Sequence, residues 1–110
     1  MGHEYQDEIS LEFARRIAAG LHDHLEWLDL ARANLDLWSE RNHDAPGLLR
    51  CYSEWQEILR RPLVEVCALM TSKTDEGQRL RQNSPFAGVL SPQDVWGIKR
   101  RLRRHEPTTT

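Results

Sequence analysis

The stretch at residues 5–21, YQDEISLEFARRIAAGL, repeats an apolar side chain every four positions. The repeating residues are Tyr5, Ile9, Phe13, Ile17 and Leu21, with Ala14 and Ala18 beside them. Because a helix turns once in 3.6 residues, this spacing places the apolar side chains on one face of an α-helix, whereas a strand would need alternation. The stretch therefore predicts an amphipathic helix.

The helical spacing continues from residue 21 to Arg41. The side chains that carry it are Leu21, Leu25, Leu28, Leu35 and Trp38. Gly20 lies between the two stretches, and glycine inside a helix costs about 1 kcal/mol relative to alanine. Either one helix ends at Gly20 and a second helix follows, or one long helix runs through this residue. The turn-forming sequence NHDAPG at residues 42–47 ends this helical part in both cases.

Two helices are predicted next, at residues 48–60 and 63–70, separated by Pro62. The residue before a proline avoids the α region, while a proline fits the first turn of a helix. The second segment, LVEVCALM, is apolar on nearly every side. We therefore expect it to lie at the centre of the core.

The last third of the chain predicts two more helices joined by a loop. Thr74 precedes two acidic residues, as an N-cap does, and predicts a short helix from Asp75 to about Gln82. Ser91, followed by a proline and then by an acidic residue, predicts a second N-cap and a helix at residues 92–104. In the loop between them, Phe86, Val89 and Leu90 are expected to pack onto the core.

Taken together, the segments predict an all-α fold: a compact bundle of five to six helices without a sheet. A chain of 110 residues suffices for one core, so we expect a single helical domain at residues 1–106 and a disordered tail at 107–110. The apolar runs are far shorter than the roughly 20 residues of a membrane span. Residues 1–4 do not resemble a signal peptide, so we expect a cytoplasmic protein without membrane contact.

The charge is distributed unevenly along the chain. Residues 1–47 carry four arginines against ten acidic residues, a net charge of −6, whereas residues 78–110 carry seven basic against two acidic residues, a net charge of +5. Two explanations fit this pattern. The two ends pack beside each other and partly neutralise, or the basic end meets nucleic acid or an acidic protein surface.

The motifs of common active sites and metal sites are missing from the sequence. Cys51 and Cys67 have no partner motif for zinc or redox chemistry, and we interpret them as reduced, semi-buried residues. His22 and His24 are two positions apart, so on a helix they point in opposite directions and cannot share one ion. Phosphate-binding loops and nucleophile elbows are also missing. We expect no enzyme activity, no catalytic residues, no metal and no cofactor.

Two features suggest contact with another macromolecule. The last predicted helix carries five cations within a stretch of six residues: Lys99, Arg100, Arg101, Arg103 and Arg104. Arg79 and Arg81 are candidates for the same basic patch. Four tryptophans are many for this length. Trp38 and Trp55 fall on inner stripes, whereas Trp27 and Trp96 fall beside them. Trp27 and Trp96 are therefore predicted as partner-binding anchors, or else as residues at the edge of the core.

Two stretches carry a resemblance to a group of bacterial proteins. They are LARANL at residues 30–35 with the tryptophan that follows it, and the segment that runs from Glu54-Trp55 to LRQNSPFAGVL at residues 80–90. These stretches resemble patterns in short helical proteins whose genes lie beside genes predicted to encode toxins or nucleotidyltransferases. The resemblance covers most of residues 30–98, and SPFAG is its distinctive part. It implies an antitoxin-like partner protein and assigns no residue roles.

The sequence thus predicts a small bacterial interaction or regulatory protein that acts by protein–protein contact, in the manner of an antitoxin. The partner is another protein or a second copy of the chain. The alternative is a small nucleic-acid-binding regulator that uses the basic C-terminal helix.

Overall fold

The structure, a computed structural model, describes the backbone of residues 2–104 and the side chains of residues 7–103. Within this range the chain forms six helices and no strand, which confirms the predicted all-α fold. None of these helices combines the length and the apolar character that crossing a bilayer requires. The predicted tail at residues 107–110 lies outside the described residues.

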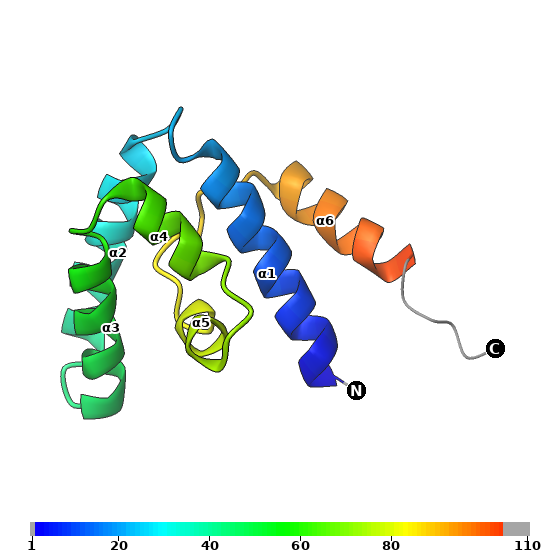
Figure 1. Cartoon of the computed structure of the whole chain (residues 1–110). Coiled ribbons are helices and arrows are strands. Elements are labelled where there is room, and N and C mark those ends of the chain that lie inside the picture. The colour runs from blue at the N-terminus through cyan, green and yellow to red at the C-terminus, as the bar shows by residue number, and fades with distance from the viewer. Residues whose placement is uncertain (1, 105–110) are drawn as a thin grey trace.

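Helix α1 (Gly2–Gly20) runs through the middle of the molecule (Figure 1). It contacts α4 (Leu63–Met70), α5 (Asp75–Arg81) and α6 (Pro92–Arg104). Its inward side chains Ala14 and Ile17 are each 5% exposed. The repeat that predicted this helix therefore also marks the face on which the other helices pack.

Helices α2 (Glu26–Arg41) and α3 (Pro46–Ile58) form a hairpin at one end of the molecule (Figure 1). Asn42 ends α2, and its side-chain amide donates to the carbonyl of Trp38 at 3.0 Å and to the hydroxyl of Tyr52 at 3.2 Å. The ring of Trp38 also contacts the ring of Tyr52, with centroids 5.8 Å apart. Asn42 thus connects the end of α2 to α3.

The first helix ends at Gly20, so α1 and α2 are two helices and not one. Residues 21–25 form the turn between them. A Cβ at Gly20 would lie 2.8 Å from two ring carbons of Trp27, a distance at which the ring would have to move. Glycine therefore permits the close approach of Trp27 to the end of α1.

The prediction that residues 63–70 lie at the centre of the core is wrong. In α4 only Val66 and Met70 are buried, whereas Val64 is 72% exposed. The helix is eight residues long and packs on one side of α1 and α5, so its other side faces solvent. Apolar composition alone did not distinguish a central helix from a peripheral one.

Trp55 on α3 lies at the centre of the core instead. Its side chain is fully buried, its indole N–H donates to the carbonyl of Leu80 at 3.1 Å, and Phe86 meets the ring edge-on with centroids 6.2 Å apart. Phe86 comes from the α5–α6 loop, residues 82–91. As predicted, Phe86 is buried, and Val89 and Leu90 pack against the core.

Candidate interaction surface

Helix α6 begins as the sequence predicts. The hydroxyl of Ser91 accepts from the backbone N–H of Asp94 at 3.1 Å, and Pro92 occupies the first helical position. The predicted inner stripe is also found: Ile98 is 5% exposed, and Val95 and Leu102 are half-buried. This stripe fixes which side of α6 packs on the molecule and which side remains for solvent or a partner.

Part of the acidic front, helix α1, lies beside the basic end of the chain: α6 packs on α1 and runs antiparallel to it (Figure 1). Arg16 on α1 lies 3.8 Å from the carboxylate of Asp94, and Arg101 lies 3.6 Å from that of Glu12. The pair Glu12–Arg101 is the kind of contact expected if the two ends neutralise each other, one of the two explanations of the charge pattern, whereas Arg16–Asp94 joins a cation of the acidic part to an acid of the basic helix. Among the described residues, this neutralisation uses one of the four α6 cations whose side chains are described.

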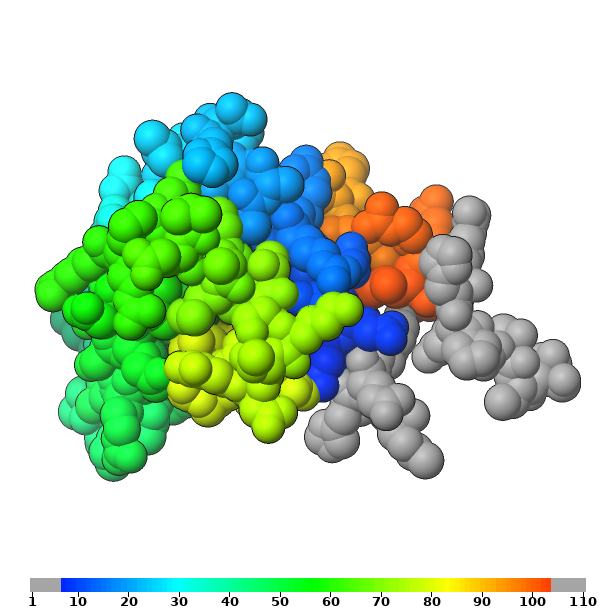
Figure 2. Space-filling view, in the orientation of Figure 1, coloured from blue at the N-terminus to red at the C-terminus, as the bar shows by residue number. Residues whose placement is uncertain are grey.

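The other three described cations of α6 point outward together with a tryptophan. Lys99, Arg100 and Arg103 are exposed and take part in no ion pair with a described residue, while Trp96 is 60% exposed. We call these four residues the α6 outer face. Figure 2 shows α6 at the edge of the molecule, against α1. The side chain of Arg104, the fifth predicted cation, lies outside the described residues.

A shallow groove of about 390 Å³ runs along the α6 outer face; its lining residues are Pro92, Gln93, Trp96, Gly97 and Arg100. A Cβ placed at Gly97 would meet nothing within 4 Å. Glycine in a helix costs about 1 kcal/mol relative to alanine, and here no contact inside the described chain requires it. Gly97 leaves the groove open beside the exposed indole.

Trp27 and Trp96, the two predicted anchors, have different surroundings. Trp27 is half-buried and packs against the core cluster. Its ring stacks on that of His24, with centroids 4.6 Å apart and an angle of 15° between the planes. Its contacts are therefore largely within the chain, whereas Trp96 presents most of its surface to solvent.

Arg79 and Arg81 do not join the patch on α6, which corrects the sequence interpretation. Arg79 makes a two-pronged ion pair with Glu54 on α3, at 3.0 and 2.8 Å, and its guanidinium lowers the pKa of that carboxyl. Arg81 turns inward and donates to the carbonyls of Met70 and Ser72. Both arginines hold α5 to its neighbours.

The candidate chemical groups remain apart. Cys51 is buried and Cys67 half-buried, neither forms a disulfide, and burial raises the pKa of both thiols. Their thiolate forms are therefore disfavoured at neutral pH. Among the described side chains, no group of three histidine, cysteine or acidic residues is placed to hold a metal ion.

Sequence reasoning identified the cations and Trp96 but missed Gly97 and a cavity beside Arg81. A glycine inside a strongly amphipathic helix was an available signal for Gly97. The cavity had no such signal, because its lining comes from four separate segments of the chain.

Comparisons with known proteins give no family for the chain. No family model matches it, and neither the curated proteins nor the solved structures contain a significant match.

Proposed function

We propose that this chain is a small interaction or regulatory protein that acts by protein contact, in the manner of an antitoxin. Its partner binds the α6 outer face and presents an acidic surface to it. The indole of Trp96 anchors the partner, and Lys99, Arg100 and Arg103 select it by charge. Aromatic and arginine side chains are the residue types that most often dominate the binding energy of protein interfaces.

The observation that carries the proposal is the groove beside Trp96. An exposed indole, an adjoining groove and a glycine with no packing role inside the described chain occur together on one helix face. Each is ordinary when alone. Together they form a surface that another chain can approach closely, and on binding that chain would bury the indole ring of Trp96.

The charges around α6 favour an acidic protein. Arg16 and Arg101 are engaged by carboxylates between α1 and α6, whereas the three cations of the α6 outer face form no ion pair with a described residue. Charge complementarity raises association rates and suppresses wrong partners, although it adds less to affinity than the buried anchor does.

Co-purification from the native host tests the proposal. Trp96→Ala and Gly97→Leu should each reduce retention of a stoichiometric companion at least tenfold, because one removes the anchor and the other fills the groove. Val64→Ala is the matched control, since it removes an apolar side chain that is 72% exposed on α4. Circular dichroism should show unchanged helix content in all three variants.

Two outcomes would contradict the assignment of this surface. One is companion binding that survives both α6 substitutions. The other is binding that is lost equally in Val64→Ala. Trp27→Ala completes the set: a loss of retention there without a loss of stability would move the anchor to the sequence-predicted site on α2.

A nucleic-acid-binding regulator is the second candidate, and the three outward cations favour it. Neutralising several phosphates makes affinity fall steeply with salt. Measuring the affinity for generic duplex DNA at about 50 mM and at about 200 mM salt separates the two candidate functions. A steep loss that disappears in the triple variant Lys99→Gln, Arg100→Gln, Arg103→Gln would support the regulator. Weak binding to DNA that hardly depends on salt would exclude the regulator and leave protein binding as the proposed function.

A further inference from the structure

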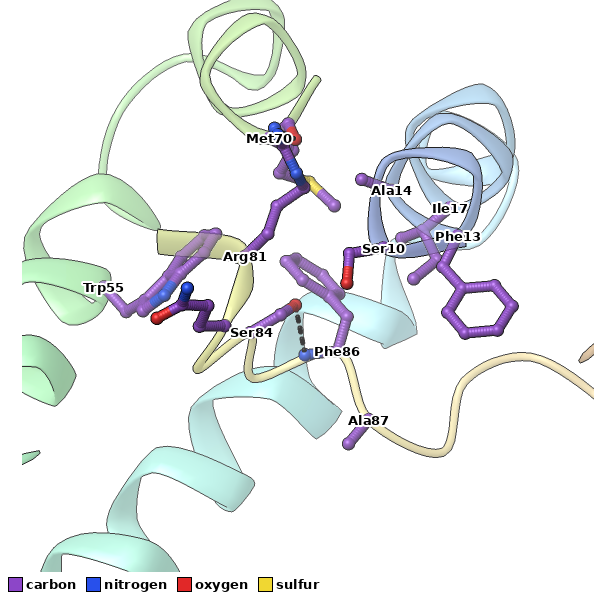
Figure 3. Close-up of a pocket in the computed structure, with 11 residues that line it drawn as sticks. Ser10, Phe13, Ala14, Ile17, Trp55, Met70, Arg81, Ser84, Phe86 and Ala87 are labelled. Carbon is purple, nitrogen blue, oxygen red and sulfur yellow. Dashed lines mark hydrogen bonds between the residues drawn. The ribbon is translucent and has the colours of Figure 1, made fainter. Parts of the chain in front are cut away.

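The cavity beside Arg81, of about 190 Å³, is part of the core (Figure 3). Ala14, Met70 and Phe86 in its lining are each 5% exposed or less. The backbone N–H of Phe86 donates to the hydroxyl of Ser84 at 3.3 Å, as the dashed line in Figure 3 marks. The lining is therefore largely used by contacts within the chain. The outward side of α2 offers more free apolar surface.

Helix α2 has two apolar stripes, of which one is buried in the core. The buried stripe contains Ala31 and Leu35, which are both fully buried. The other contains Leu30, Ala33 and Leu37, at spacings of three and four that place them on one side of the helix. Leu30 is 40% and Leu37 is 41% exposed. A surface helix usually presents polar residues to solvent, so this second stripe, which we call the α2 stripe, is suited to contact another chain.

The charge of α2 is opposite to that of α6. α2 carries four acidic residues against two arginines, a net charge of −2, whereas α6 carries five cations against one acidic residue, a net charge of +4. Asp36 follows Ala33 by three positions and Glu40 follows Leu37 by three, so both acids border the α2 stripe. Both are exposed and take part in no ion pair with a described residue. The α2 stripe therefore complements the cations of the α6 outer face.

The two surfaces also agree in length and shape. The α2 stripe spans the seven positions from Leu30 to Leu37, and the α6 outer face spans the seven from Trp96 to Arg103. At 1.5 Å per residue, each is about 10 Å long. The small side chain of Ala33 between two leucines leaves room for a planar ring. The indole of Trp96, which is 60% exposed, can pack there.

Figure 1 shows α2 and α6 on either side of α1, at opposite ends of the molecule. The two surfaces would therefore meet on different copies of the chain. We propose that a second copy of this chain docks its α2 stripe on the α6 outer face, so that copies associate head to tail. Because the two surfaces differ, each end of such a dimer keeps one of them free and a further copy can add.

This inference rests on the proposed function in that it takes the α6 outer face as a binding surface. It adds a regulation of that surface: self-association covers Trp96 until the companion displaces the second copy. Only two short helices, of 16 and 13 residues, make the contact. We therefore expect a weak interface that forms at high protein concentration and that a tighter companion can replace.

Sedimentation velocity of the purified chain tests the proposal. The average mass should rise with protein concentration, and high salt should reduce the rise because the two surfaces attract each other by charge. Trp96→Ala on α6 and the double variant Leu30→Ser, Leu37→Ser on α2 should each weaken association at least tenfold. Val64→Ser is the matched control, since it removes an exposed apolar side chain from α4, and it should leave association unchanged.

Mixing the two variants separates a lost contact from a lost fold. The Trp96→Ala chain keeps its α2 stripe, while the Leu30→Ser, Leu37→Ser chain keeps its α6 outer face. Each variant alone should be monomeric. Their equimolar mixture should form a heterodimer that does not grow further, because only one complementary pair of surfaces is left.

A charge reversal provides a second route that leaves the leucines in place. Asp36→Lys with Glu40→Lys should weaken association at least tenfold, because it sets cations against the α6 outer face. Lys99→Glu with Arg103→Glu should do the same from the other side. Mixing these two double variants should restore a heterodimer.

Three results would overturn the proposal: a native chain that stays monomeric at millimolar concentration, association that Val64→Ser weakens as much as Trp96→Ala does, or mixtures in which neither variant pair forms a heterodimer. The companion distinguishes these failures from a failure of the proposed function. The Leu30→Ser, Leu37→Ser chain should still retain the companion. Companion binding that survives Trp96→Ala would contradict the proposed function, whereas a monomeric native chain that loses its companion in Trp96→Ala would contradict self-association alone.

Discussion

The segment formed by α5 and the loop that follows it, residues 75–91, and helix α6 attach to the molecule in different ways. The first segment is held by buried and half-buried polar bonds: Trp55 donates to Leu80, Asn34 donates to Pro85, and Arg81 donates to the end of α4. α6 is held by one apolar stripe and two long ion pairs to α1. The first segment therefore supports the fold, while α6 keeps most of its surface available.

Truncating a tryptophan in each region should separate these roles most clearly. Trp55→Ala removes a fully buried side chain and leaves the carbonyl of Leu80 without its donor, so we expect a loss of about 3–5 kcal/mol in unfolding free energy. Trp96→Ala removes an exposed side chain and should change stability by less than about 0.5 kcal/mol. Urea denaturation measures both. Equal losses would mean that α6 belongs to the core.

The side chain of Asn34 should account for much of the loop's attachment. Its amide donates to the carbonyls of Pro85 at 2.8 Å and Ala87 at 3.2 Å. Asn34→Ala leaves the carbonyl of Pro85, whose bond to Asn34 is half-buried, without this donor and should cost about 1–3 kcal/mol. Gln93→Ala, a polar substitution at an exposed position of α6, is the control and should be nearly neutral. Urea denaturation of the pair gives the difference; a neutral Asn34→Ala would mean that the loop is held by Phe86 alone.

Replacing a glycine by alanine should change the stability of the protein in opposite directions in the two regions. A Cβ at Gly77 in α5 would lie 2.5 Å from the backbone oxygen of Ser72, so Gly77→Ala should destabilise by about 1–3 kcal/mol. Gly97→Ala in α6 meets nothing and should stabilise by about 1 kcal/mol because alanine favours the helix. Melting temperatures of the two variants test this contrast, and destabilisation by Gly97→Ala would contradict the open groove.

The ion pairs between α1 and α6 should contribute least. Glu12 contacts Arg15 at 2.5 Å and Arg101 at 3.6 Å, and both arginines are largely exposed. Glu12→Gln should therefore cost at most about 1 kcal/mol, and the cost should shrink at high salt. Unfolding at low and at high ionic strength checks this. A large loss that salt does not reduce would show that α6 depends on these pairs and not on its apolar stripe.

Local rules explain why much of the fold was predictable. The caps at Thr74 and Ser91 and the start of α4 after Pro62 depend on groups a few residues apart, and Thr74 accepts from the N–H of Gly77 at 3.2 Å as expected. α3 ends at Ile58, two residues before the end predicted at residue 60. The start of α3 was predicted two residues late, because Pro46 was assigned to the turn although proline also suits a first helical position.

The candidate sites were predictable only in part. The cations and Trp96 of α6 are visible in the sequence, since the apolar stripe of the helix itself determines which residues point outward. The different surroundings of Trp27, the pairing of Arg79 with Glu54 and the inward turn of Arg81 were not visible. They depend on Gly20, Glu54 and the carbonyls of α4, which the chain brings close from other segments.

The sequence alone determined that the chain is helical and where α4, α5 and α6 begin and end, because these properties follow from neighbours three or four positions apart. It also determined that the charge is divided between the two ends of the chain. Tertiary packing decided that α1 and not α4 is central, that Trp55 organises the core, and that a cavity forms around Arg81. Those features arise where distant segments meet, and the periodicity of a single helix carries no information about its partners.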